Sequence, residues 1–299
     1  MRSNRIITYW RGRSFHLPPR HRSLRHPWQV AVGITITFAL IILGVFAPWL
    51  TPHPPTENQL TARLLAPSWQ PQPNGGLYLL GTDLLGRDIL SRLIAGARTS
   101  SLVSLLSVSL SGFIGVSLGL VAGFKRRYQL VLDRLADIWQ AVPYLIVALA
   151  AAAVLGSSLV NVVIVLAITT WTLFYRVVRA EVLRLRNQDF IVAGRALGAS
   201  EQRILWVYIL PHVVPIIIPV ATLLTANVII FEASLSFLGL GIPPPAVSWG
   251  SMAADGRGYE VLAWWVPLFP GLAIFVAVLG INVLGDSLRD WFDPFAGKS

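Results

Sequence analysis

Two short motifs in the sequence hold residue types that could carry out covalent or phosphate chemistry. Residues Gly115-Val116-Ser117-Leu118-Gly119 fit the G-x-S-x-G pattern around a hydrolase nucleophile. That pattern needs a sharp turn from a strand into a helix, and this copy lies inside a long apolar run, so we predict no hydrolase site. Gly297-Lys298-Ser299 matches the end of a phosphate-binding loop, but Phe292 occupies the position where that loop needs its first glycine. We therefore expect no nucleotide site in this chain.

The remaining reactive side chains do not form a cluster in the sequence. The chain has no cysteine, which excludes disulfides and cysteine-based metal sites. Its histidines do not have the H-E-x-x-H spacing of a catalytic zinc site; they are His16, His21, His26, His53 and His212. Glu232, which follows Asn227, is the best candidate for an ionisable group within an apolar segment. Such a carboxylate must face protein or water, which leaves two roles open: structural hydrogen bonding, or lining a solute path.

Long apolar segments must position these residues. The chain has 299 residues, of which 55% are hydrophobic and 13% are charged, whereas soluble domains have about 25% charged residues. A helix that crosses a membrane needs about 20 mostly apolar residues. The segments that meet this need are 28–50, 100–123, 138–155, 159–177, 213–236 and 264–285. We therefore predict an all-α polytopic membrane protein with six transmembrane helices.

The first and third of these segments need separate interpretation. Residues 28–50 follow an arginine-rich stretch, but their apolar run is longer than the roughly 7–15 residues of a secretory signal, so we expect a retained anchor. Pro143 lies inside the third segment and predicts a kink there. Because only Gly156-Ser157-Ser158 separate the third segment from the fourth, the two are predicted to form a tight hairpin.

Positive charge predicts the orientation of the chain. On one side of the predicted spans lie Arg2, Arg5, Arg11, Arg13, Arg20, Arg22, Arg25, Lys125, Arg126, Arg127, Arg134, Arg176, Arg179, Arg184, Arg186, Arg195, Arg203, Arg289 and Lys298. The other side holds only Arg63, Arg87, Arg92, Arg98 and Arg257. The positive-inside rule then places both termini in the cytoplasm and the spans in the inner or plasma membrane. The formal net charge of +10 reflects this topology, so we expect membrane lipid and no nucleic acid as partners.

Small residues recur along the second predicted span. Gly115, Gly119 and Gly123 are four residues apart, and serines occupy positions 101, 104, 107 and 111. Small side chains at this spacing allow helix backbones to approach closely in lipid. We predict a tight helix–helix contact here.

The most informative polar segment is the loop 189–204. Residues 190–197 are predicted to form a short helix of small side chains that is broken at Gly198, and a second short helix begins at Ser200, a suitable N-cap. Small residues allow a helix to dock closely in a partner's groove, and Arg195 and Arg203 add polar anchors. The alternative is a connector that lies on the membrane surface.

This loop resembles the EAA motif of permease subunits in ATP-binding-cassette importers, in which E-A-A-x-x-x-G precedes I-L-P. The corresponding triad is Val192-Ala193-Gly194, the motif glycine is Gly198, and Ile209-Leu210-Pro211 closes the element. Val192 stands in place of the motif's Glu, and Gly194 in place of its second Ala. These departures keep the small-residue helix and remove the carboxylate that could pair with an ATPase.

Other segments resemble the dipeptide/oligopeptide/nickel permease family. They are 80–93, which fits G-T-D-x-x-G-R-D-x-x-S-R, then 232–241, 243–245 and 248–250, and finally 269–271, 282–286 and 288–290 near the last helix. The resemblance covers nearly everything from Gly81 to Pro294. The N-terminal tail and the first span resemble, more loosely, the extra N-terminal helix of the C-type permease in these importers.

The resemblance implies a methionine-importer-like (MetI-like) permease core plus an extra N-terminal helix. The implied parts are a basic cytoplasmic tail (1–27), the first transmembrane helix with an extracytoplasmic loop (28–98), the permease core (99–286) with its coupling loop (189–211), and a cytoplasmic tail (287–299). A second homologous permease, two ATPase subunits that bind the ATP, and an extracytoplasmic solute-binding protein would complete the importer.

The resemblance also implies what this subunit does. It would be a non-catalytic subunit without a cofactor of its own, and it would translocate di- or oligopeptides. The same machinery could carry nickel or another small solute, and nothing in the sequence separates these solutes. A stand-alone channel or a secondary transporter is less favoured, because ionisable residues are scarce in the predicted spans.

Carried over residue by residue, the family motifs imply three functional groups and no metal site. The ATPase-coupling loop would use Asp189, Ala193, Gly194, Arg195, Ala196, Gly198, Ala199, Ser200, Arg203 and Pro211. The translocation path or outer gate would use Asn227, Glu232, Ser234 and Ser236. Docking of the binding protein would involve segments 81–98 and 239–262, with Asp83, Arg87, Asp88, Trp249 and Asp255. The alternative for these two segments is a set of interfacial helices that cap the bundle.

Overall fold

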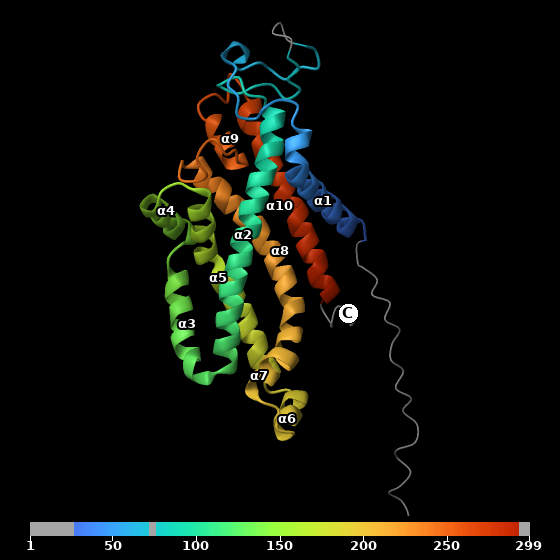
Figure 1. Ribbon diagram of the computed structural model, residues 1–299, viewed down its shortest axis with the longest axis vertical. Helices are drawn as coiled ribbons and strands as arrows, with labels where there is room; N and C mark the ends of the chain where they lie inside the picture. Colours follow the sequence, from blue (N-terminus) through green and yellow to red (C-terminus); the bar gives the residue numbers. More distant parts are fainter. Residues whose placement is uncertain (1–26, 72–75, 293–299) are drawn as a thin grey trace, which may run out of the picture.

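The computed structural model describes residues 27–71 and 76–292, and within these ranges every regular element is helical (Figure 1). The predicted basic tail, three of the histidines (His16, His21 and His26) and Gly297-Lys298-Ser299 lie outside the described residues. The helices are α1 (Pro27–Leu50), α2 (Ile89–Phe124), α3 (Arg126–Ala141), α4 (Tyr144–Leu155), α5 (Leu159–Leu185), α6 (Asp189–Ala196), α7 (Glu201–Arg203), α8 (Leu210–Phe237), α9 (Trp249–Asp255) and α10 (Trp265–Phe292). A 3-10 turn, Leu60–Ala62, lies in the loop before α2, and a π-helical turn, Ile204–Ile209, joins α7 to α8.

Five helices are long and apolar enough to cross a membrane, and α3 with α4 forms a sixth span if the bent pair is counted as one. The predicted kink at Pro143 is confirmed, and it is a sharp break, because the two helices on either side meet at 86°. Pro143 explains the break: it has no N–H to donate to the preceding turn, and its ring clashes with that turn. The chain at Val142 is extended, with φ −97° and ψ 132°.

The second span begins eleven residues earlier than its apolar pattern predicted, at Ile89 rather than residue 100. Asp88 sets this start, because its carboxylate accepts the backbone N–H of Ser91 as an N-cap. The fifth span is also longer than predicted, since α7, the π-helical turn and α8 run on as one apolar helix from Glu201 to Phe237.

The predicted close contact along the second span is confirmed, and its partner is α5. A Cβ atom added at Gly119 would lie 2.9 Å from the Tyr175 carbonyl oxygen, and one at Gly123 would lie 2.6 Å from Val182 Cβ. The α2 helix therefore touches α5 backbone to backbone, as small residues permit in lipid. Ser117 faces away from α5 within regular helix, so its G-x-S-x-G context is not a nucleophile elbow.

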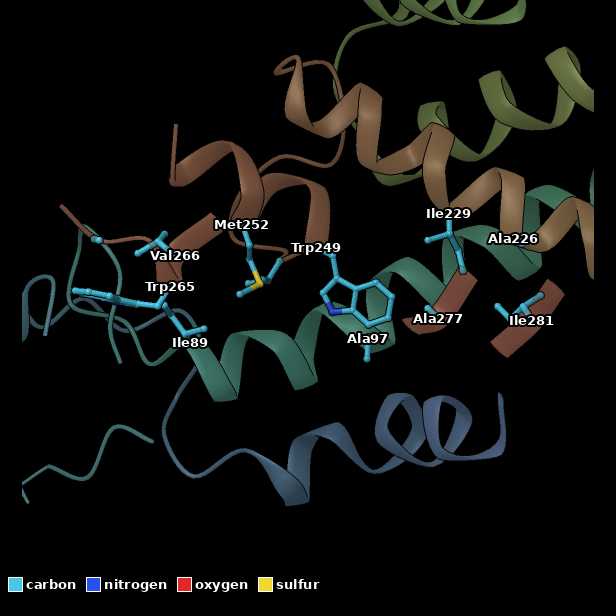
Figure 2. Close-up of a cluster of buried hydrophobic side chains, with 12 residues drawn as sticks. Ile89, Ala97, Ala226, Ile229, Trp249, Met252, Trp265, Val266, Ala277 and Ile281 are labelled. Atoms are coloured by element: carbon cyan, nitrogen blue, oxygen red, sulfur yellow. The ribbon is translucent and has the colours of Figure 1, made fainter. Parts of the chain in front are cut away.

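A buried apolar cluster fixes the end of the bundle that carries α9 (Figure 2). Trp249 of α9 and Trp265 of α10 lie in it beside Ile89 of α2 and Ile229 of α8. The opposite end of the bundle carries α6 and α7, which project beyond the long helices (Figure 1). The two predicted partner-binding regions therefore lie at opposite ends of the molecule.

Candidate functional site

The α6–α7 hairpin takes the shape that the sequence predicts for the loop. The α6 helix ends at Ala196, and Gly198 follows in the left-handed region with φ +82°. Glycine adopts that conformation without strain, whereas most side chains do not, which explains the residue type. Ser200 caps α7, because its hydroxyl oxygen accepts the backbone N–H of Arg203 at 3.3 Å.

One apolar cluster anchors this hairpin to the long helices. Ile191 of α6 is fully buried beside Ile204 and Ile209 of the π-helical turn. The same cluster includes Val182 and Leu185 of α5. Any movement of α6 is therefore transmitted directly to the ends of α5 and α8, since close-packed interiors transmit strain.

Most of the predicted coupling residues face outward from the hairpin. The exposed ones are Asp189, Ala193, Arg195, Ala196, Gly198, Ser200, Arg203 and Pro211, whereas Ala199 is half-buried and Gly194 is buried near the Tyr208 ring. Leu197 was missed by the sequence reasoning, although 89% of it is exposed at the tip. Val192, in the motif's Glu position, is also exposed.

At the opposite end, four charged side chains form one connected network. Asp83 pairs with Arg87 at 2.7 Å and with Arg92, and Asp255 of α9 pairs with the same two arginines at 3.0 and 2.9 Å. The network therefore ties the loop before α2, α2 itself and α9 together. Arg92 pairs with both aspartates of this network, but it was not among the predicted docking residues.

The prediction that Asp83, Asp88 and Trp249 touch a binding protein is not supported, because all three side chains are buried. Asp88 caps α2, and Trp249 Nε1 donates a hydrogen bond to the Leu93 carbonyl oxygen at 3.0 Å. These buried residues stabilise the segments that form the outer surface. Arg87 and Asp255 remain partly exposed, so they alone of the five can meet a partner directly.

The predicted path residues separate into different environments. Glu232 is fully buried, where it accepts hydrogen bonds from Ser100 at 3.1 Å and Ser236 at 2.7 Å. Of the two roles left open for Glu232, these contacts support the structural one: its carboxylate joins α8 to α2. Ser236 is buried in the same contacts, and the Ser234 hydroxyl donates to the Ile230 carbonyl oxygen.

Asn227 lines a cavity of about 280 Å³ beside the α3–α4 break, and Ser234 lines a separate, mostly apolar cavity of about 340 Å³. Gln140, Tyr144 and Thr172, none of which was predicted, line the cavity beside the break as well. Within the described ranges, no three His, Asp or Glu residues come together to hold a metal ion.

Comparison with known proteins agrees with this architecture. Residues 115–298 match the family model described as "Binding-protein-dependent transport system inner membrane component", and residues 21–67 match that of the "N-terminal TM domain of oligopeptide transport permease C". The chain is 42% identical to a di/tripeptide transport system permease protein of Pseudomonas aeruginosa, with 91% of this chain and 90% of the relative covered. It is 37% identical to a probable D,D-dipeptide transport system permease protein of Escherichia coli, with coverage of 91% and 89%.

A solved structure shares the fold at low sequence identity. The inward-facing MetNI methionine ABC transporter superposes with a TM-score of 0.55 at 18% identity, covering 68% of this chain and 96% of that one. The chain therefore belongs to the family of binding-protein-dependent transport system inner membrane components, the permease subunits of ATP-binding-cassette importers.

Proposed function

We propose that this chain is one of two related permeases of an importer for di- or oligopeptides, and that it carries no catalytic activity itself. The curated relatives named above, which align over about nine-tenths of both chains, are permeases for di- and tripeptides and for D,D-dipeptides, and they support the choice of substrate. Two ATPase subunits would supply the energy, and an extracytoplasmic binding protein would deliver the peptide. Both termini would lie in the cytoplasm, on the side that the positive charge marks.

The proposal rests mainly on the α6–α7 hairpin. It projects beyond the bundle, presents Leu197 to solvent and is anchored in the same apolar cluster as α5 and α8. An element with these properties can seat in a cleft of an ATPase and transmit the closure of the ATPase pair to the spans. The proposed ATPase contact comprises Asp189, Ala193, Gly194, Arg195, Ala196, Gly198, Ala199, Ser200, Arg203 and Pro211, to which Leu197 is added.

The outer end would receive the binding protein. The ion-pair network fixes the segment before α2 against α9, and Arg87 and Asp255 reach its surface. A fixed and partly charged surface suits repeated docking and release, because electrostatic complementarity raises association rates more than affinity. In this proposal Asp83, Asp88 and Trp249 shape the docking surface without touching the binding protein.

Replacement of Gly198 tests the coupling role. Gly198→Leu places a side chain at φ +82°, which costs about 1–2 kcal/mol, although nothing lies within 4 Å of the added Cβ. Gly198→Asn is the matched control, because Asn tolerates the left-handed region. The assay is ATP hydrolysis stimulated by binding protein and peptide in the reconstituted importer. We expect Gly198→Leu to lose stimulation while inserting normally, and Gly198→Asn to keep most of it; full stimulation of Gly198→Leu would refute the proposal.

The wild-type importer in proteoliposomes tests the substrate. We expect uptake of labelled di- and oligopeptides. Uptake of a nickel chelate with no uptake of peptide would instead assign the same machinery to another solute. Transport by this chain without the ATPases would identify a stand-alone channel or secondary transporter.

A further inference from the structure

The α3–α4 break interrupts a candidate membrane span, and it leaves backbone polar groups without helical partners. Pro143 has no N–H for the carbonyl group four residues before it, and Val142 adopts an extended conformation. Non-helical backbone within a span is tolerated only where it is covered by protein or lines a cavity that holds water or a ligand. Val142 and Pro143 do line the cavity of about 280 Å³.

Asn227 places this cavity inside the candidate span Glu201–Phe237. It lies ten residues before the end of α8 at Phe237, which is about 15 Å at 1.5 Å per residue. The hydrocarbon core is about 30 Å thick. The distance from Asn227 to this end of α8 is thus about half the thickness of the core.

The described residues that line the cavity carry hydrogen-bonding groups but no charge. The Gln140 side-chain nitrogen donates to Thr172 Oγ1 at 2.8 Å, which leaves the Gln140 side-chain oxygen as an acceptor. The Asn227 amide and the Tyr144 hydroxyl make no hydrogen bond with any other described residue. The cavity therefore offers free donors and acceptors of the kind that a peptide bond needs.

The cavity is also small. At about 280 Å³ it is near the lower limit of small-ligand pockets, which is about 300 Å³. It can hold one or two amino-acid residues of a peptide, and it offers no ionic partner for a charged terminus or side chain. Weak, neutral contacts suit a solute that must leave as readily as it enters.

We propose that this cavity is a transit site for neutral amide groups, in which Asn227 and Gln140 hydrogen-bond a peptide bond of the passing solute. The proposal rests on the proposed function, because it names the part of a peptide that this permease contacts. Asn227 acts here as a specificity-determining residue. The absence of charge in the lining explains how one site can serve peptides of different sequence.

The absence of cysteine from the chain allows a direct test by single-cysteine labelling. Asn227→Cys is compared with Thr222→Cys, a control on the same helix that lines a separate apolar cavity and whose hydroxyl bonds to the Ile218 carbonyl oxygen. A charged, water-soluble methanethiosulfonate reagent is applied to the reconstituted importer, and modification of this chain is read by mass spectrometry. We expect Asn227→Cys to react, with protection severalfold greater during turnover of dialanine, and Thr222→Cys to show no peptide-dependent change.

Two further variants separate a recognition role from a structural one. Asn227→Leu removes the hydrogen bonds, and we expect dialanine uptake to fall about five- to tenfold while stimulated ATP hydrolysis is retained. Asn227→Asp introduces a charge, and we expect uptake of dilysine to rise relative to dialanine. If wild type imports peptides, yet Asn227→Cys shows no protection and both variants keep the wild-type uptake ratio, the transit site is refuted. If wild type imports no peptide, the proposed function fails instead.

Discussion

A methyl group at Gly115 should weaken the contact between α2 and α5, whereas the same change one turn earlier, at Gly112, should not. An added Cβ at Gly115 would meet the carbonyl oxygen of Trp171, and it would lie 2.6 Å from Phe174 Cβ and 3.0 Å from the Tyr175 nitrogen. Because two of these atoms are backbone, α5 itself must shift. At Gly112 the nearest atom is 3.5 Å away, in the Phe174 ring, which is ordinary contact.

The difference in stability between Gly115→Ala and Gly112→Ala isolates the steric cost of the added methyl group. Both substitutions gain about 1 kcal/mol of helix propensity, so this gain cancels between them. Overpacking costs about 1–3 kcal/mol, and we expect Gly115→Ala to be less stable than Gly112→Ala by that amount. For a protein of this size the difference corresponds to about 2–4 °C in Tm per kcal/mol.

The measurement is thermal unfolding of the purified importer, with peptide uptake by each variant as a second readout. Gly112→Ala should match or exceed the wild-type Tm, and Gly115→Ala should fall below it. Equal Tm values for the two variants would show that α2 and α5 can separate without penalty. The close backbone contact would then not stabilise the bundle.

Four further substitutions test other parts of the molecule. Arg92→Met leaves buried Asp83 with Arg87 as its single ion-pair partner and should destabilise the protein by about 3 kcal/mol. Asp255→Asn, at a side chain 35% exposed, should cost at most about 1 kcal/mol, and unequal shifts in Tm check this difference. Leu197→Asp should change stability by less than about 0.5 kcal/mol, because 89% of the residue is exposed, yet it should abolish stimulated ATP hydrolysis. Pro143→Ala should favour continuation of α3 into α4 and reduce peptide uptake, and spin-label distances across the break would detect the straightening.

The helical content was predictable from the sequence because apolar length and small-residue spacing are local signals. The glycines at positions 115, 119 and 123 predicted a close helix contact, and the structure confirms it. Their partner could not be predicted, since nothing in the spacing distinguishes α5 from the other helices. The bend at Pro143 was predicted in kind but not in degree, because the 86° angle depends on how α3 and α4 each pack.

The outer ion-pair network shows a different limit of the sequence. The letters of a short motif do not say which of its charges are buried, and the two arginines that pair with Asp83 also pair with Asp255 of α9. Arg87 and Asp255 are 168 residues apart, so no local pattern joins them. The apolar pattern likewise placed the start of the second span after Arg92. In the sequence a charged residue is typical of a loop, and its burial depends here on partners that the local pattern does not contain.

The spans are held to one another by two different kinds of contact, and this difference decides which of them can move. The α2 and α5 helices touch through glycines, and α6 shares a buried apolar cluster with α5 and the start of α8. In contrast, α3 is attached to α5 by ion pairs, between Asp133 and Arg179 at 2.6 Å and between the exposed Asp137 and Arg176 at 2.9 Å, and by one small apolar cluster around Ala136.

An exposed ion pair contributes about 0–1 kcal/mol, and the apolar cluster between α3 and α5 is small, whereas α2 packs closely on α5 over several turns. A displacement of α6 should therefore carry α5 and α2 along as one body, while α3 and α4 can change their position at lower cost. The cavity lies between these two groups of helices: Gln140 of α3 and Tyr144 of α4 line one side, and Thr172 of α5 lines the other. The step powered by ATP would thus reshape the transit site without any contact between the site and the coupling hairpin.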